Sequence, residues 1–107
     1  MVNNNIIKDF LRTDDIKEKS MYIKLLSNNL EREFRSISPR KMLFFPKLPK
    51  VYVFSKSLYI EMPSYGSRVY QRKITEMRHK LRKDFIVDVH YFDGKTTFVI
   101  RGEQTWD

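Results

Sequence analysis

The sequence predicts a small α+β domain in which helices cover one face of an antiparallel sheet. Three observations support this class: two apolar stripes at helical spacing, four runs rich in β-branched and aromatic residues, and turn residues between paired runs. The predicted order is α-β-β-α-β-β. A length of 107 residues and an apolar content of 41% fit a single domain with one core.

The amino-terminal part, residues 1–38, is expected to be helical. Its first dozen residues fit one short amphipathic turn or helix. A helix of about 20 residues is then expected to begin after Asp15, which has capping-box spacing to Glu18, and to end near Ser36 because Pro39 disfavours continuation. This helix would serve as a scaffold or pair with its symmetry mate in a homodimer. Its apolar stripe comprises Ile16, Ile23, Leu26, Leu30, Phe34 and Ile37.

Residues 39–50 hold three prolines among basic and apolar residues, which rules out a regular helix. We interpret this segment as a Pro-rich basic strap. Because Met42 to Phe45 are too apolar for a free linker, the strap is expected to close over the core. The alternative is a basic arm that lies on a partner.

Residues 51–101 form the predicted ββαββ core. The runs 51–54 and 58–62 are joined either by a short hairpin connection at Ser55 to Ser57 or as one long irregular strand. The runs 86–92 and 96–100 flank Asp93-Gly94, a strong hairpin signal because both turn positions tolerate positive φ. The tail, residues 102–107, has no predicted structure.

The stretch between the two strand pairs predicts a helix over residues 67–83. At about 100° per residue, Tyr70, Ile74, Met77 and Leu81 share one narrow stripe, which we expect to be buried against the sheet. The opposite side is basic. It carries Arg68, Arg72, His79, Arg82 and Lys83, with Lys73, Arg78 and Lys80 along its borders.

The positive charge is concentrated around this helix. The formal net charge is +8, but residues 40–83 alone carry +10, whereas residues 1–39 carry +1 and residues 84–107 carry −3. Glu76 is the only acidic residue between Arg68 and Lys83, although solvated helices usually mix charges of both signs. Basic residues at the amino end of a helix also oppose its dipole. An anionic partner would offset both effects.

We therefore predict a small accessory protein that contacts the phosphate backbone of DNA or RNA, largely independently of base sequence. In the alternative interpretation the basic face docks on an acidic protein, such as a nucleic-acid enzyme, as a regulator or inhibitor. The Asn- and Lys-rich amino-terminal half would suit a phage or mobile-element protein. The predicted contact residues are Ser67, Arg68, Arg72, Lys73, His79, Arg82 and Lys83, with Arg40, Lys41, Lys47 and Lys50 as an auxiliary arm.

Catalysis, a cofactor and a metal site are not expected. The chain has no cysteine, which excludes disulfides, thiolate zinc sites and cysteine nucleophiles. A metal-dependent nuclease is a minor alternative, because polar residues gather near the last hairpin. However, the turn accounts for Asp93, and one carboxylate with one imidazole is an incomplete site. The residues concerned are Asp84, Asp88, His90, Asp93, Lys95 and Glu103.

Aromatic residues on the strands are expected in the core or in cross-strand pairs rather than as a platform for RNA bases. They are Tyr52, Phe54, Tyr59, Tyr91 and Phe98. No apolar run approaches the roughly 18–20 residues of a membrane span, and the start of the chain lacks the pattern of a secretion signal. We expect a cytoplasmic protein that does not bind membranes.

Overall fold

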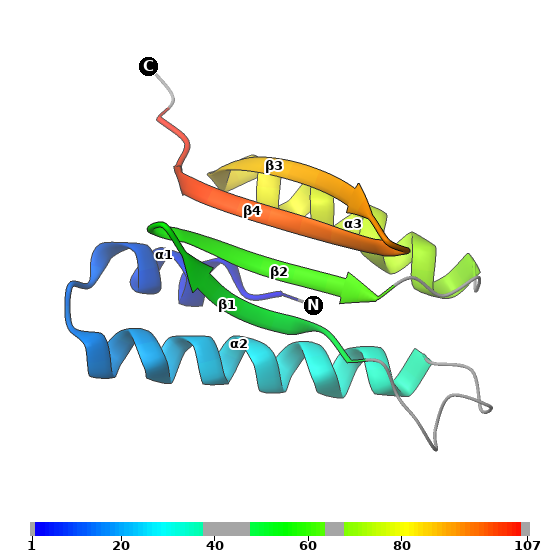
Figure 1. Ribbon diagram of the computed structural model, residues 1–107, viewed down its shortest axis with the longest axis horizontal. Coiled ribbons are helices and arrows are strands. Elements are labelled where there is room, and N and C mark those ends of the chain that lie inside the picture. Colours follow the sequence, from blue (N-terminus) through cyan, green and yellow to red (C-terminus); the bar gives the residue numbers. More distant parts are fainter. Residues whose placement is uncertain (1, 38–47, 64–67, 106–107) are drawn as a thin grey trace.

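A computed structural model describes residues 2–37, 48–63 and 68–105 (Figure 1). Most of the predicted strap lies outside the described residues. The predicted class and the α-β-β-α-β-β order are confirmed, and the short amphipathic segment expected at the amino end is a helix. In chain order the elements are α1 (Asn4–Arg12), α2 (Ile16–Ile37), β1 (Lys50–Phe54), β2 (Ser57–Pro63), α3 (Arg68–Asp84), β3 (Phe85–Phe92) and β4 (Lys95–Glu103).

The four strands form one antiparallel sheet in the order β1-β2-β4-β3. Two-residue turns close the β1–β2 and β3–β4 hairpins. Ser55 and Lys56 have φ values of 50° and 66°, and Asp93 and Gly94 have φ values of 53° and 70°. Positive φ at both central positions matches the right-handed strand twist, so both predicted hairpins are confirmed. The carboxyl-terminal strand of each hairpin, β2 and β4, forms the centre of the sheet.

Side-chain caps fix the beginnings of the first two helices. Asn3 Oδ1 accepts a hydrogen bond of 2.9 Å from Asn5 N, and Asp15 Oδ1 accepts one of 2.8 Å from Lys17 N. The capping box of α2 differs from the predicted reciprocal pair. The Glu18 carboxylate accepts from the Thr13 hydroxyl at 2.6 Å, and Asp15 N also donates to that hydroxyl oxygen. The hydroxyl oxygen of Thr13, rather than the Glu18 carboxylate, therefore accepts the hydrogen bond from the Asp15 backbone N–H.

The helices pack on one face of the sheet and share one hydrophobic core with it. The stripe predicted for α3 is confirmed, because Tyr70, Ile74, Met77 and Leu81 are all buried. On α2 the expectation for Ile16 is wrong: its side chain is 80% exposed. Ile16 is the first residue of the helix, ahead of the turns that meet α1 and the sheet. Leu26, Leu30 and Phe34 of the same stripe are buried.

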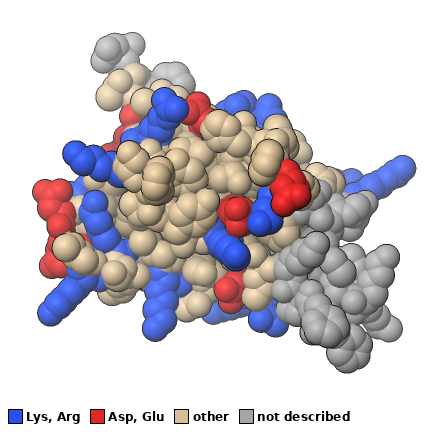
Figure 2. Space-filling model, viewed as in Figure 1, with Lys and Arg blue, Asp and Glu red and all other residues tan. Residues whose placement is uncertain are grey.

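No described helix covers the opposite face of the sheet, which we call the open face (Figure 1). Tyr52 and Tyr59 stack across β1 and β2 there, with ring centroids 5.1 Å apart, and Phe54 packs edge-on against Tyr59. Figure 2 views this face and shows an uncharged area over the sheet with charged side chains of both signs around it. The predicted cross-strand pairing is confirmed for these tyrosines, and Phe98 is in the core, whereas Tyr91 is 68% exposed.

Candidate nucleic-acid interface

Two contacts fix the position of α3: its apolar stripe is buried against the sheet, and its Tyr70 packs against α2. Tyr70 is fully buried, and its ring meets Phe34 of α2 edge-on at a centroid distance of 5.0 Å. Because the stripe faces the sheet, the residues half a turn away must face outward. The sequence thus orients the basic face of α3 through its apolar residues.

Five basic side chains of α3 are exposed on this outward face. At 100° per residue they fall within an arc of about 100°, and the 15 residue steps from first to last span about 22 Å. Within the described parts of the chain, none of them makes an ion pair. We call these residues the basic face: Arg68, Arg72, His79, Arg82 and Lys83.

Two of the three basic residues at the borders of α3, Lys73 and Arg78, contact neighbouring elements instead. Lys73 Nζ lies 3.3 Å from Glu33 Oε1 of α2, in a partly buried ion pair. Arg78 Nη1 donates a hydrogen bond of 3.3 Å to the Tyr91 hydroxyl of β3. Of the predicted contact residues on α3, Lys73 is therefore the one whose charge is already balanced within the fold.

The charge pattern along α3 is one-sided with respect to its dipole. The first turn has no acidic residue, and the last turn carries Arg82 and Lys83. The two cations at the carboxyl end are stabilised by the negative end of the dipole, whereas Arg68 at the amino end is not. Local helix stability alone therefore does not explain the presence of Arg68 and Arg72 here.

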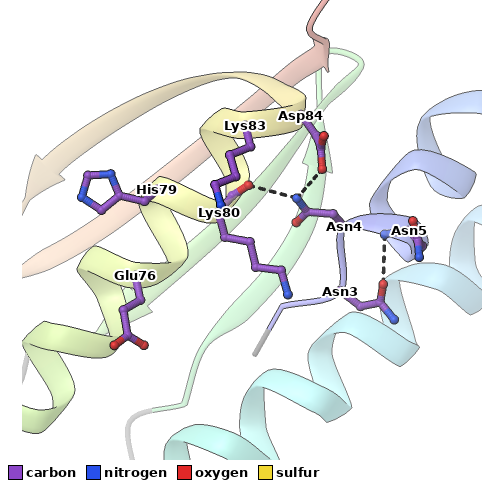
Figure 3. A pocket seen from close by; sticks show the side chains of 8 residues that line it. All are labelled: Asn3, Asn4, Asn5, Glu76, His79, Lys80, Lys83 and Asp84. Carbon is purple, nitrogen blue, oxygen red and sulfur yellow. Dashed lines mark hydrogen bonds between the residues drawn. The ribbon is translucent and has the colours of Figure 1, made fainter.

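A shallow depression of about 520 Å³ lies between the basic face and the amino end of α1 (Figure 3). Asn4 projects into it, and its Nδ2 donates to the Lys80 carbonyl at 3.0 Å and to Asp84 Oδ2 at 2.7 Å. Asn4 thereby attaches the amino end of α1 to the last turns of α3. Sequence reasoning missed this contact, because 76 residues separate the two partners and no local pattern marks it.

Of the remaining predicted contact residues, Lys50 is the one that the structure describes. Lys50 begins β1, where Val51 packs against the core; strand alternation therefore directs Lys50 to the open face, away from α3. The predicted cap Ser67 and the auxiliary residues Arg40, Lys41 and Lys47 lie outside the described residues.

The polar residues considered for a nuclease do not form one cluster in the described part of the chain, and several of them are engaged in ion pairs. Asp88 Oδ2 lies 2.7 Å from Arg101 Nη2 on the open face. Glu103 forms a bidentate pair with Arg12 of α1, at 2.8 and 3.1 Å. The hydrogen bond from Arg12 lowers the pKa of the Glu103 carboxyl. In the described part of the chain, no three acidic or histidine side chains are grouped so as to hold a metal ion.

The chain matches no protein-family model, and no curated protein or solved structure is significantly similar to it. Among the described helices, none is both long and apolar enough to span a bilayer.

Proposed function

We propose that this protein binds the phosphate backbone of nucleic acid through the basic face of α3, largely independently of base sequence. The observation that supports the proposal most strongly is the exposure of five basic side chains on one helix face, with no ion pair among the described residues. Some cations elsewhere are paired, as in Lys73–Glu33 and Arg12–Glu103. The exposed Lys17 and Lys24 of α2 also make no ion pair among the described residues, but they share their helix with three acidic side chains. The basic face is thus a set of charges that folding itself leaves without counter-ions.

The dimensions of the face suit a phosphate backbone. A length of about 22 Å corresponds to about six base-pair steps of a duplex at 3.4 Å per step. Arginine and lysine neutralise phosphates without reading bases, and the guanidinium of Arg72 or Arg82 can contact two phosphate oxygens at once. Contacts of this type give affinity and orientation but little sequence specificity.

Salt dependence measures the number of these contacts. We expect binding to a fluorescent duplex to weaken with salt at a log–log slope of about −4, and binding to a single strand of the same length at a slope of about −3. Arg72→Ala/Arg82→Ala should reduce the magnitude of the slope by about two, one for each contact. The control Lys17→Ala/Lys24→Ala removes two exposed cations from α2 and should leave the slope unchanged.

Two results would count against this function. The first is a native protein that binds neither DNA nor RNA at low salt. The second is an equal loss of slope in the α2 control, which would show that total charge rather than the α3 face determines binding. The first result, combined with a captured acidic protein whose binding requires Arg72 and Arg82, would favour the protein-docking alternative.

A further inference from the structure

The two edges of the sheet are protected to different extents. The edge strand β1 has five residues, and α2 packs beside it. The other edge strand, β3, has eight residues and contains neither lysine nor proline, the residues that usually prevent edge pairing. It also exposes large apolar side chains: Ile86 is 46%, Tyr91 68% and Phe92 83% exposed.

We propose that β3 pairs with β3 of a second copy of this chain, forming a continuous eight-stranded sheet. The pattern of backbone hydrogen bonds permits this. The turn at Asp93-Gly94 makes Phe92 and Lys95 a hydrogen-bonded pair, and such pairs alternate along an antiparallel ladder. His90 and Asp88 therefore bond to β4. The alternate residues of β3 are Val87, Val89 and Tyr91. Their backbone N–H and C=O groups point outward from the sheet edge and are free to pair with another strand.

The side chains select one register from those that the backbone permits. If Val87 faces the partner's Val89, Asp88 is opposite the partner's Asp88, and two carboxylates repel. If Val89 faces the partner's Tyr91, the two His90 side chains oppose each other. If Val89 faces the partner's Val89, Asp88 lies opposite the partner's His90 twice, by the two-fold symmetry. Only this last register places a hydrogen-bond donor, the imidazole N–H, opposite a carboxylate acceptor at both positions.

The same register also covers exposed apolar surface. Ile86 and Phe92 project to the open face together with Asp88 and His90, because residues of a strand alternate between its faces. With Val89 at the two-fold axis, Ile86 lies opposite the partner's Phe92, which is the most exposed apolar residue of the described chain. Tyr91 lies opposite the partner's Val87. Each apolar residue of the edge thus meets an apolar one.

The symmetry has a geometric consequence for α3. The two-fold axis of an antiparallel edge-to-edge pair is perpendicular to the sheet, so the helical layers of both copies lie on the same side. Two basic faces would then be presented together. The dimer does not depend on the proposed function, and it is tested without nucleic acid so that the two can fail separately.

Charge exchange tests the register. Sedimentation equilibrium between about 10 μM and about 1 mM should show the native chain associating toward twice its mass of 13.0 kDa. Asp88→Lys removes the carboxylate acceptor opposite His90, and His90→Asp places two carboxylates opposite each other. Each should weaken association by roughly tenfold or more. An equal mixture of the two variants should recover native affinity within about threefold. In the mixed dimer the introduced lysine faces the introduced aspartate, and the remaining His90 faces the remaining Asp88.

Two controls separate this interface from other effects. Arg101→Ala releases Asp88 from its ion pair inside one chain and should not weaken association. Met21→Lys places a charge on the exposed side of α2 and should also have no effect. A native chain that stays monomeric to about 1 mM, or a mixture no better than its components, overturns the proposal. So does a dimer that Met21→Lys abolishes, which would indicate pairing through α2.

Hydrogen exchange gives a second readout on the unmodified chain. The amides of Val87, Val89 and Tyr91 should exchange more slowly as protein concentration rises, because only pairing protects them. The amides of Asp88 and His90 are bonded to β4 and should exchange at a rate independent of concentration. Uniform rates in a protein that does dimerise would place the interface elsewhere and contradict the proposal.

Discussion

The helices α2 and α3 pack on the same face of the sheet and meet through Phe34 and Tyr70, yet their outward surfaces differ. α2 has five basic and three acidic side chains in 22 residues, whereas α3 has seven basic and two acidic in 17. One of the acids of α3, Asp84, is at its last position. Both helices satisfy the same packing requirement. The charge difference is therefore not explained by folding, and it points to a partner for α3.

The first prediction concerns the packing that the two helices share and has the largest expected effect. Leu30 of α2 and Leu81 of α3 are both fully buried. Leu30→Ala and Leu81→Ala should each lower the free energy of unfolding by about 2–5 kcal/mol, because each leaves a cavity. Ile16→Ala, at an exposed position, should change it by less than about 0.5 kcal/mol. Urea denaturation measures all three, and a large loss for Ile16→Ala would contradict the packing described.

The second prediction tests the electrostatic difference between the helices by reversing two charges on each. Arg72→Glu/Arg82→Glu should weaken DNA or RNA binding by roughly a hundredfold, because acidic groups would then face the phosphates. Lys17→Glu/Lys24→Glu makes the same change in net charge on α2 and should weaken binding by less than about threefold through the long-range field alone. Equal losses measured by fluorescence anisotropy would show that the two surfaces do not differ in function.

The third prediction compares two neighbouring cations of α3. Arg72 is exposed, whereas Lys73 is paired with Glu33. Arg72→Ala should weaken nucleic-acid binding several-fold, and Lys73→Ala by less than about twofold, because its charge is already balanced. Lys73→Ala should instead affect stability. A double-mutant cycle with Glu33→Ala should give a coupling of about 0.2–1 kcal/mol. A greater binding loss at Lys73 than at Arg72 would reverse this assignment.

The smallest expected effect lies away from both outward surfaces, at the Arg12–Glu103 pair. The hydrogen bond from Arg12 lowers the pKa of Glu103 in the folded chain. Its stabilising effect is therefore complete above the pKa of the unfolded carboxyl, about 4.3, and is lost as pH falls through the folded pKa. Glu103→Gln should slightly reduce the melting temperature at neutral pH. The difference from the native protein should disappear at about pH 3, and a constant difference would contradict the shift.

Much of this fold could be predicted because its signals are local. The Asp93-Gly94 turn and the stripe from Tyr70 to Leu81 depend on backbone preference and on periodicity, which are properties of neighbouring residues. The outward orientation of the basic residues then follows from the position of the stripe. Non-local features could not be obtained in this way. Asn4 bound to α3, the pairing of Lys73 and the placement of Lys50 on the open face depend on how distant elements dock.

Nuclear magnetic resonance mapping tests the central claim most directly. A short duplex is added to labelled protein at low salt, and shifts of backbone amide signals report which face is contacted. We predict shifts concentrated at the basic face of α3, Arg68, Arg72, His79, Arg82 and Lys83, with the exposed positions of α2 unchanged. Shifts confined to α2 or to the open face, or no shifts at low salt, would contradict a phosphate-binding role for α3.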